Sequence, residues 1–178
     1  MQPADVVNFW TEAGPKRWFK KNAGFDAEVQ ARFTPLHHAA ARRELDAWAA
    51  SAQGALALLL LLDQFPRNIW RDSAHAFATD PLARHFAGRA VDAGQDRQVD
   101  PSLRCFFYLP FEHSESLEDQ DRACALLEVL GDAEFTKWAH LHRNIIRRFG
   151  RFPHRNISLG RETTENEAEF LRSGGFAG

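Results

Sequence analysis

Eight apolar residues in a row, Ala55 to Leu62, restrict the fold of this chain more than any other feature. A helix that crosses a bilayer needs about 20 apolar residues, so this run is too short to span a membrane. The surrounding segment, QGALALLLLLDQF, would be apolar on nearly every side of a helix. Such a helix is stable only when it is buried. The sequence therefore predicts a central helix enclosed by other helices.

Most of the remaining chain has helical periodicity as well. The segment DAEFTKWAHLHRNIIRRFG is expected to begin at Asp132 and end at Gly150, and Asp80 is expected to cap an earlier helix. Thr164 and Glu167 have capping-box spacing. The apolar segment PSLRCFFYLP is assigned to a helix because no partner strand is evident, and no hairpin signal occurs. We expect an all-α protein of about eight to ten helices in antiparallel pairs.

Length and composition narrow the class of protein. A chain of 178 residues is expected to form one domain, residues 1–178, and to fold without a disulfide or metal. The net charge of -2 argues against a general nucleic-acid binder. Cys105 and Cys124 are interpreted as buried thiols in a reducing compartment, and the N-terminus lacks a signal-peptide pattern. We expect a cytoplasmic protein with no membrane or nucleic-acid partner.

Two Phe-Pro corners follow helical stretches: QFPRN, which begins at Gln64, and RFPHRN, which begins at Arg151. Proline ends a helix because it lacks an N–H, a following Arg can bind the last carbonyls, and Asn can cap the next helix. Each corner is therefore interpreted as a joint between helices. The alternative is that the polar side chains of both corners form a binding site.

The second corner carries more cations than a joint requires. Residues 143–161 include six Arg, one His and no acidic residue. At 100° per residue, His142 and Arg148 flank the apolar stripe of the preceding helix, so both are expected to be partly buried with acidic partners. Asp63, Glu112 and Glu115 are the candidate partners. The alternative is an anion site, since Arg side chains recognise carboxylate and phosphate.

A second polar cluster, LPFEHSESLEDQ, contains Glu112, His113 and Glu115. A His close to carboxylates could act as a general base. The metal signal is poor because His140 and His142 would point about 160° apart on a helix. The sequence has no zinc-protease, P-loop, dinucleotide-binding or nucleophile-elbow motif. We expect no metal site and no cofactor.

Four segments together, LALLLLLDQFPRNIWR, FFYLPFEHSE, RRFGRFPHRN and LGRETTENEAEFL, resemble the bacterial family called domain of unknown function 924. The resemblance extends from VVNFW to FLRSGGF. It implies an all-helical fold of stacked antiparallel hairpins, similar to tetratricopeptide proteins with additional helices, and it brings no established activity. The family motifs fall on Asp63, Gln64, Arg67, Asn68, His113, Glu115, His142, Arg148, Arg151, His154, Arg155 and Asn156.

Three interpretations of these residues stay open. The first is a binding module for an anionic peptide or small metabolite, with Asp63, Gln64 and His142 in support of the ligand-binding residues Arg67, Asn68, Arg148, Arg151, His154, Arg155 and Asn156. The second is an enzyme that uses Glu112, His113 and Glu115 in acid–base chemistry on an anionic substrate. The third is that the polar motifs only stabilise the fold.

Two structural expectations separate these interpretations. The two corners are expected to approach each other and to share a polar cluster with His113 or Glu115, because each has more polar groups than its own helix end can satisfy. Arg148 is expected to be buried against a carboxylate if its role is structural, and its removal would then cost about 3–5 kcal/mol. If Arg148 captures a ligand, its removal would leave stability nearly unchanged.

Overall fold

The computed structural model describes residues 1–177 and divides them into two compact units. The first unit consists of Met1–Arg71 and His75–Pro110, and the second of Asp72–Ala74 and 111–177. Neither unit contains a strand within the described part of the chain, so the predicted all-α class is confirmed. The stacking expected of tetratricopeptide proteins and the organisation as one domain stay predictions.

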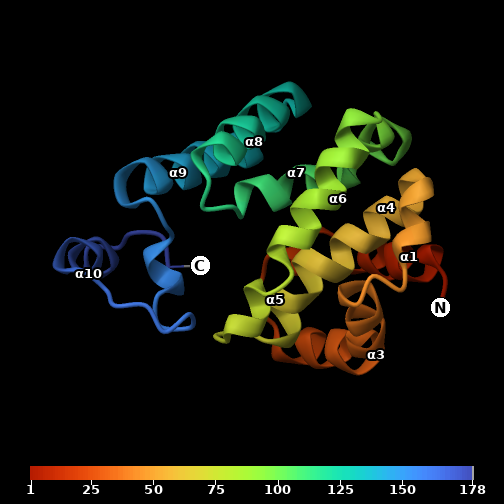
Figure 1. Cartoon of the computed structure of the whole chain (residues 1–178), viewed down its shortest axis with the longest axis horizontal. Coiled ribbons are helices and arrows are strands. Elements are labelled where there is room, and N and C mark those ends of the chain that lie inside the picture. The colour runs from red at the N-terminus through yellow and green to blue at the C-terminus, as the bar shows by residue number, and fades with distance from the viewer. Residues whose placement is uncertain (178) are drawn as a thin grey trace. The chain divides into compact units, whose positions relative to one another are not determined.

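The first unit is built around aromatic side chains. Its helices are α1 (Pro3–Ala13), α2 (Pro15–Trp18), α3 (Ala23–Ala41), α4 (Ala52–Leu59), α5 (Phe65–Ile69), α6 (Asp80–Asp92) and α7 (Cys105–Glu112), whose last two residues belong to the second unit (Figure 1). Trp10 of α1 lies 5.4 Å from the ring of Phe65 and 5.7 Å from that of Phe106. The segment PSLRCFFYLP is helical, as expected from the lack of a partner strand, and consists of a 3₁₀ turn, Pro101–Leu103, and most of α7.

One glycine allows α4 to pack closely on the chain before it. A Cβ atom added to Gly54 would lie 2.0 Å from the carbonyl oxygen of Trp48, in the 3₁₀ helix Asp46–Ala50. No side chain fits in that space. Glycine at position 54 therefore sets how α4 meets this preceding segment.

The predicted central helix exists, but it does not end at the first Phe-Pro corner. A π-helical turn, Leu60–Gln64, joins α4 to α5, and the N–H of Phe65 donates to the Leu60 carbonyl. A π-turn shifts the hydrogen-bond register by one residue, which lets the helix continue through Pro66 to Ile69. The expectation that Phe-Pro breaks the helix here was therefore wrong.

The π-turn leaves backbone carbonyls that its own helix does not satisfy, and side chains from elsewhere in the unit donate to them. A buried carbonyl without a donor is costly, so these side chains stabilise the turn. Three contacts supply the donors: His37 Nδ1 to the Leu61 oxygen at 2.8 Å, Thr79 Oγ1 to the Leu62 oxygen at 2.6 Å, and Arg67 Nη1 to the Asp63 oxygen at 2.5 Å.

The start of α6 differs from the expected cap at Asp80. Asp80 is the first residue of α6 rather than its cap, and Thr79 occupies the cap position without a capping hydrogen bond. The Thr79 hydroxyl instead donates to the Leu62 carbonyl. The Asp80 carboxylate instead binds Arg67.

The second unit contains a helical hairpin followed by an irregular segment. Helices α8 (Leu117–Leu130) and α9 (Ala133–Phe149) pack side by side, and a 3₁₀ turn, Pro153–Arg155, and α10 (Glu165–Arg172) follow (Figure 1). Asp132 caps α9 and Gly150 ends it in the left-handed region at φ 71°, as predicted. The capping box of Thr164 and Glu167 is also confirmed. The core of this unit contains Ile145, Ile146 and Phe152, with Leu141, Phe149, Phe170 and Phe176 packed against it.

Candidate functional site

The arginine of the first corner is held by two buried carboxylates. Its guanidinium forms a two-pronged ion pair with Asp80, at 2.9 and 3.0 Å, and lies 3.2 Å from Asp63 Oδ1. Gln64 donates to the other oxygen of Asp63 at 2.5 Å. Arg67 also donates to the Asp63 carbonyl of the π-turn, so its side chain stabilises the turn through which the helix continues. This geometry favours a structural role for Arg67.

Asn68 of the first corner has an internal partner as well. Its amide donates to Asp26 Oδ1 at 2.8 Å, and Arg71 binds the same carboxylate at 2.7 and 2.9 Å. Burial alone would raise the pKa of Asp26, but the hydrogen bonds from Arg71 and Asn68 outweigh burial and lower it. Asn68 therefore fastens α5 to α3 instead of capping a further helix.

The second corner is also fixed by a carboxylate. Arg151 binds the buried Glu167 at 2.6 and 2.9 Å and donates to the Glu162 carbonyl at 2.8 Å. Glu167 accepts the backbone N–H of Thr164 at 2.8 Å as part of its capping box. The hydrogen bond from Arg151 is the main cause that lowers the pKa of Glu167 to about 2. The corner is thereby attached to the first turn of α10.

A chain of polar contacts continues from Glu167 to the start of α8. The fully buried amide of Asn156 donates to Glu167 at 3.2 Å, and Arg161 Nε donates to the Asn156 oxygen at 3.0 Å. Arg161 then binds Glu115 at 2.7 and 3.0 Å, and Glu115 also accepts the backbone N–H of Phe152 at 2.8 Å. Asn156 and Glu115 therefore belong to one network that stabilises the corner.

The remaining acid–base candidates lie close to this network. His142 is buried, as predicted, and its Nδ1 lies 2.5 Å from Glu112 Oε1, although the angle is not that of a hydrogen bond. The rings of Phe152 and Phe176 pack on His142 at 5.5 and 4.6 Å. His113 is half-buried. Proton transfer by Glu112, His113 and Glu115 stays a prediction.

Two further residues of the second corner are packed against rings. Arg155 is buried with its guanidinium 4.5 Å from the centre of the Phe152 ring, and His154 lies 5.1 Å from Phe176. Arg155 belongs to the second unit and Arg67 to the first. That the two corners share a polar cluster stays a prediction.

Arg148 differs from the expectation made for it. The residue is exposed, and its guanidinium forms no hydrogen bond or ion pair with any residue between 1 and 177. It lies instead over two rings, 4.7 Å from the centre of Phe149 and 5.6 Å from that of Phe170. The predicted burial against a carboxylate was wrong, because the rings of Phe149 and Phe170 lie beside the guanidinium and the nearby Glu167 is paired with Arg151.

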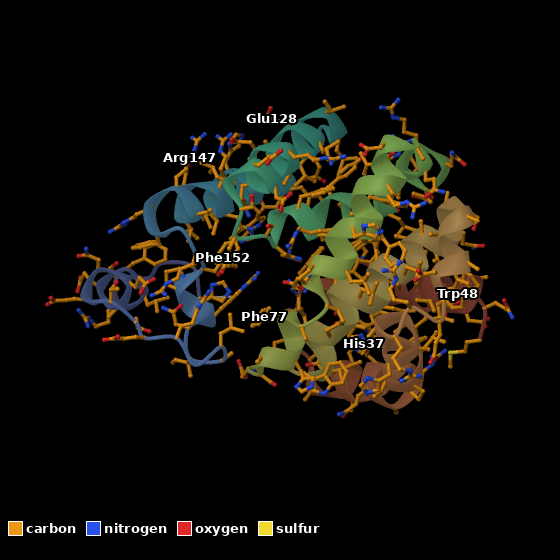
Figure 2. The ribbon with its side chains drawn as sticks, viewed as in Figure 1. His37, Trp48, Phe77, Glu128, Arg147 and Phe152 are labelled. Atoms are coloured by element: carbon orange, nitrogen blue, oxygen red, sulfur yellow. The ribbon has the colours of Figure 1, made fainter. Side chains whose placement is uncertain are left out.

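The other arginines of α9 provide a contrast. Arg143 and Arg147 both reach Asp121 of α8 at 3.4 Å. Figure 2 shows Arg147 and Glu128 on α9 and α8, where both side chains are exposed. Arg147 is exposed and Arg143 is half-buried. Among the arginines of α9, only Arg148 has no acidic partner in the described chain.

Two surface hollows of the second unit meet at Arg148. The first hollow, of about 630 Å³, is lined by Arg148, Phe149, Arg151, Thr164, Asn166 and Glu167. The second hollow, of about 480 Å³, lies along α9 and is lined by Lys137, His140, Leu141, Asn144, Ile145, Arg148, Phe149, Phe170, Gly174, Gly175 and Phe176. Arg148 can therefore donate to a molecule in either hollow. No three His, Cys, Asp or Glu side chains among residues 1–177 gather closely enough to hold a metal ion.

Comparison with known proteins agrees with the motifs in the sequence. Residues 6–175 match the family described as bacterial protein of unknown function, DUF924. The chain belongs to the DUF924 family. A solved structure similar to this DUF924 chain is a protein of unknown function, ATU0120 from Agrobacterium tumefaciens, with 53% identity, a TM-score of 0.94 and 97% of each chain covered. No curated protein matches the chain. None of the helices between residues 1 and 177 is long and apolar enough to cross a membrane.

Sequence reasoning on this DUF924 protein missed the partners that occupy its corners. Asp26 and Arg161 were not singled out, and Asp80 was identified only as a helix cap, although each holds a motif residue. Glu167 was identified only as part of a capping box. A carboxylate or guanidinium far along the chain from its partner gives no local pattern, since the pairing depends on tertiary packing.

Proposed function

We propose that this DUF924 protein binds an anionic peptide or small metabolite through Arg148. A single observation carries the proposal. The guanidinium of Arg148 lies where two hollows meet and forms no ion pair with any described residue. The rings of Phe149 and Phe170 support the guanidinium through cation–π contacts. A supported side chain loses less conformational freedom when a ligand binds, which favours binding.

The other motif residues have a different part in this proposal. Arg67, Asn68, Arg151 and Asn156 are held by internal partners, so an anion would have to displace a carboxylate to reach Arg67 or Arg151. Removing one partner of a buried ion pair is costly because the other charge stays behind. These residues therefore hold the elements in place, while Arg148 meets the ligand.

Thermal unfolding with added phosphate or acetate tests the proposal. A ligand that binds only the folded state raises the melting temperature, so both anions should raise it in the wild-type protein. The response should disappear in Arg148→Gln, which removes the charge and keeps a polar, exposed side chain. Arg147→Gln is the matched control, because it removes a neighbouring charge that lines neither hollow. An equal response in all three proteins would refute the proposal.

A further inference from the structure

The second hollow differs from the first in its chemistry. Its walls are largely apolar, with Leu141 and Ile145 of α9 on one side and Phe170 and Phe176 on the other. No Asp or Glu is among the described residues that line it, whereas Glu167 lines the first hollow. Its volume of about 480 Å³ lies within the range of small-molecule pockets. An anion with an apolar body therefore suits the second hollow better than the first.

The cations of the second hollow lie in one line along α9. Lys137 and Arg148 are 11 residues apart, which at 100° per residue brings them within about 20° of the same side of the helix. At 1.5 Å per residue they are separated by about 16 Å along the axis. Leu141 and Ile145 lie between them, and so do the polar His140 and Asn144. The hollow thus extends along α9, with apolar side chains along one edge of its middle and a cation at each end.

The two cations are not equivalent. Lys137 lies 3.8 Å from Glu134 and 5.7 Å from the centre of the Trp138 ring. Arg148 has no acidic partner among the described residues and offers a planar fork that matches a carboxylate. An anionic group should therefore bind at the Arg148 end.

Charge alone gives weak binding at this end of the helix. Arg148 is in the last turn of α9, where the unpaired carbonyls carry partial negative charge. These carbonyls favour the arginine and oppose an anion that approaches it. Apolar contact along the hollow would supply the remaining free energy, which favours a ligand with a hydrocarbon body over a bare anion.

We propose that the second hollow binds a small monocarboxylate with an apolar chain. Its carboxylate lies on Arg148 and its chain follows Leu141 and Ile145 towards Lys137. This inference rests on the proposed function, because it uses Arg148 as the anion receptor. It goes further in naming the hollow and the class of ligand.

Titration calorimetry of the full chain with sodium phosphate and with the sodium salts of acetate, butanoate, hexanoate and octanoate tests the ligand class. Each methylene that enters the hollow should raise affinity by up to about fourfold, so octanoate should bind much more tightly than acetate. Acetate and phosphate binding as tightly as octanoate would overturn the inference and leave the proposed function standing. No binding of any of these anions, phosphate included, would overturn both.

Two matched variants test which hollow is used. Asn144→Asp places a carboxylate in the second hollow, one helical turn from Arg148, and Asn166→Asp places one in the first. Both asparagines are exposed, so neither change should prevent folding. We expect octanoate affinity to fall about tenfold or more in Asn144→Asp, because the new carboxylate competes for Arg148, and to stay within about twofold in Asn166→Asp. A larger loss in Asn166→Asp would overturn the assignment to the second hollow.

Discussion

Glu115 and Arg161 join the start of α8 to the second Phe-Pro corner through two hydrogen bonds of 2.7 and 3.0 Å. The same carboxylate accepts the backbone N–H of Phe152, and Arg161 also donates to the Phe152 carbonyl at 3.1 Å. One ion pair thus contacts both backbone polar groups of Phe152, whose carbonyl also accepts the N–H of Arg155 at 3.1 Å. This relationship explains why a carboxylate and an arginine so far apart in sequence are needed at one bend.

Glu115→Gln should therefore destabilise the fold. Burial raises the pKa of Glu115, but the donors from Arg161 and Phe152 outweigh burial and lower it, so the carboxylate is charged at neutral pH. Glutamine turns one acceptor into a donor that faces other donors, which should cost about 1–2 kcal/mol of unfolding free energy. Denaturant unfolding measures this. Glu169→Gln, at an exposed ion pair with Arg172, should change stability by less than about 0.5 kcal/mol, and equal losses would contradict the network.

The stability of the second unit should depend on pH through Glu167. Its pKa is about 2 in the folded protein against 4.5 as the ordinary value. The stabilisation is therefore complete above pH 4.5 and is lost as the pH falls towards 2. Melting temperatures of the wild type and Glu167→Gln should differ near neutral pH and converge in this acidic range. A difference that is constant with pH would show that the charge of Glu167 is not the cause.

Thr79→Val tests how the π-turn is held. The substitution keeps the shape and removes the donor to the Leu62 carbonyl, so it should cost about 1–2 kcal/mol. Thr34→Val is the control, because the Thr34 hydroxyl donates to the Gln30 carbonyl within α3, which already accepts a backbone N–H of the same helix. Equal and small effects of both changes in denaturant unfolding would mean that the π-turn does not need this donor.

His37 should make the first unit sensitive to mild acid. Burial is the main cause that lowers its pKa below 6.5 in the folded protein. As the pH falls below 6.5, the unfolded chain binds a proton that the folded protein does not, so stability decreases. His37→Asn keeps a donor near the Leu61 carbonyl and should flatten the pH dependence between pH 6.5 and 5. His85→Asn provides the comparison, because His85 is an exposed histidine of α6 that is not among the causes of the lowered His37 pKa, and it should leave the wild-type slope. A slope that is unchanged in both variants would contradict a role for His37.

Local patterns were sufficient for much of the fold. The ends of α9 were predicted because Asp132 and Gly150 act within a single helix turn, and the capping box of α10 for the same reason. The π-turn was not predicted, since Pro66 normally ends a helix and only distant donors such as Thr79 make its continuation stable.

The candidate site was harder to predict than the fold. The sequence identified the arginines of the second corner but could not decide which of them had partners. Arg151 forms an ion pair with Glu167 of α10, whereas Arg148, about one helical turn earlier, lies over the Phe170 ring of the same helix. This difference depends on how α10 packs on α9. Helix periodicity placed Arg148 at the edge of the apolar stripe, but it could not show that phenyl rings rather than a carboxylate lie beside it.

The most direct test of the central claim is to observe the arginine side chains by NMR during titration with hexanoate. The Nε–H resonance of Arg148 can be assigned by its absence in Arg148→Gln. We expect this resonance to shift progressively with added hexanoate, while that of Arg151, which is bound to Glu167, stays in place. A resonance of Arg151 that shifts while that of Arg148 does not would contradict the account and return the anion site to the second Phe-Pro corner.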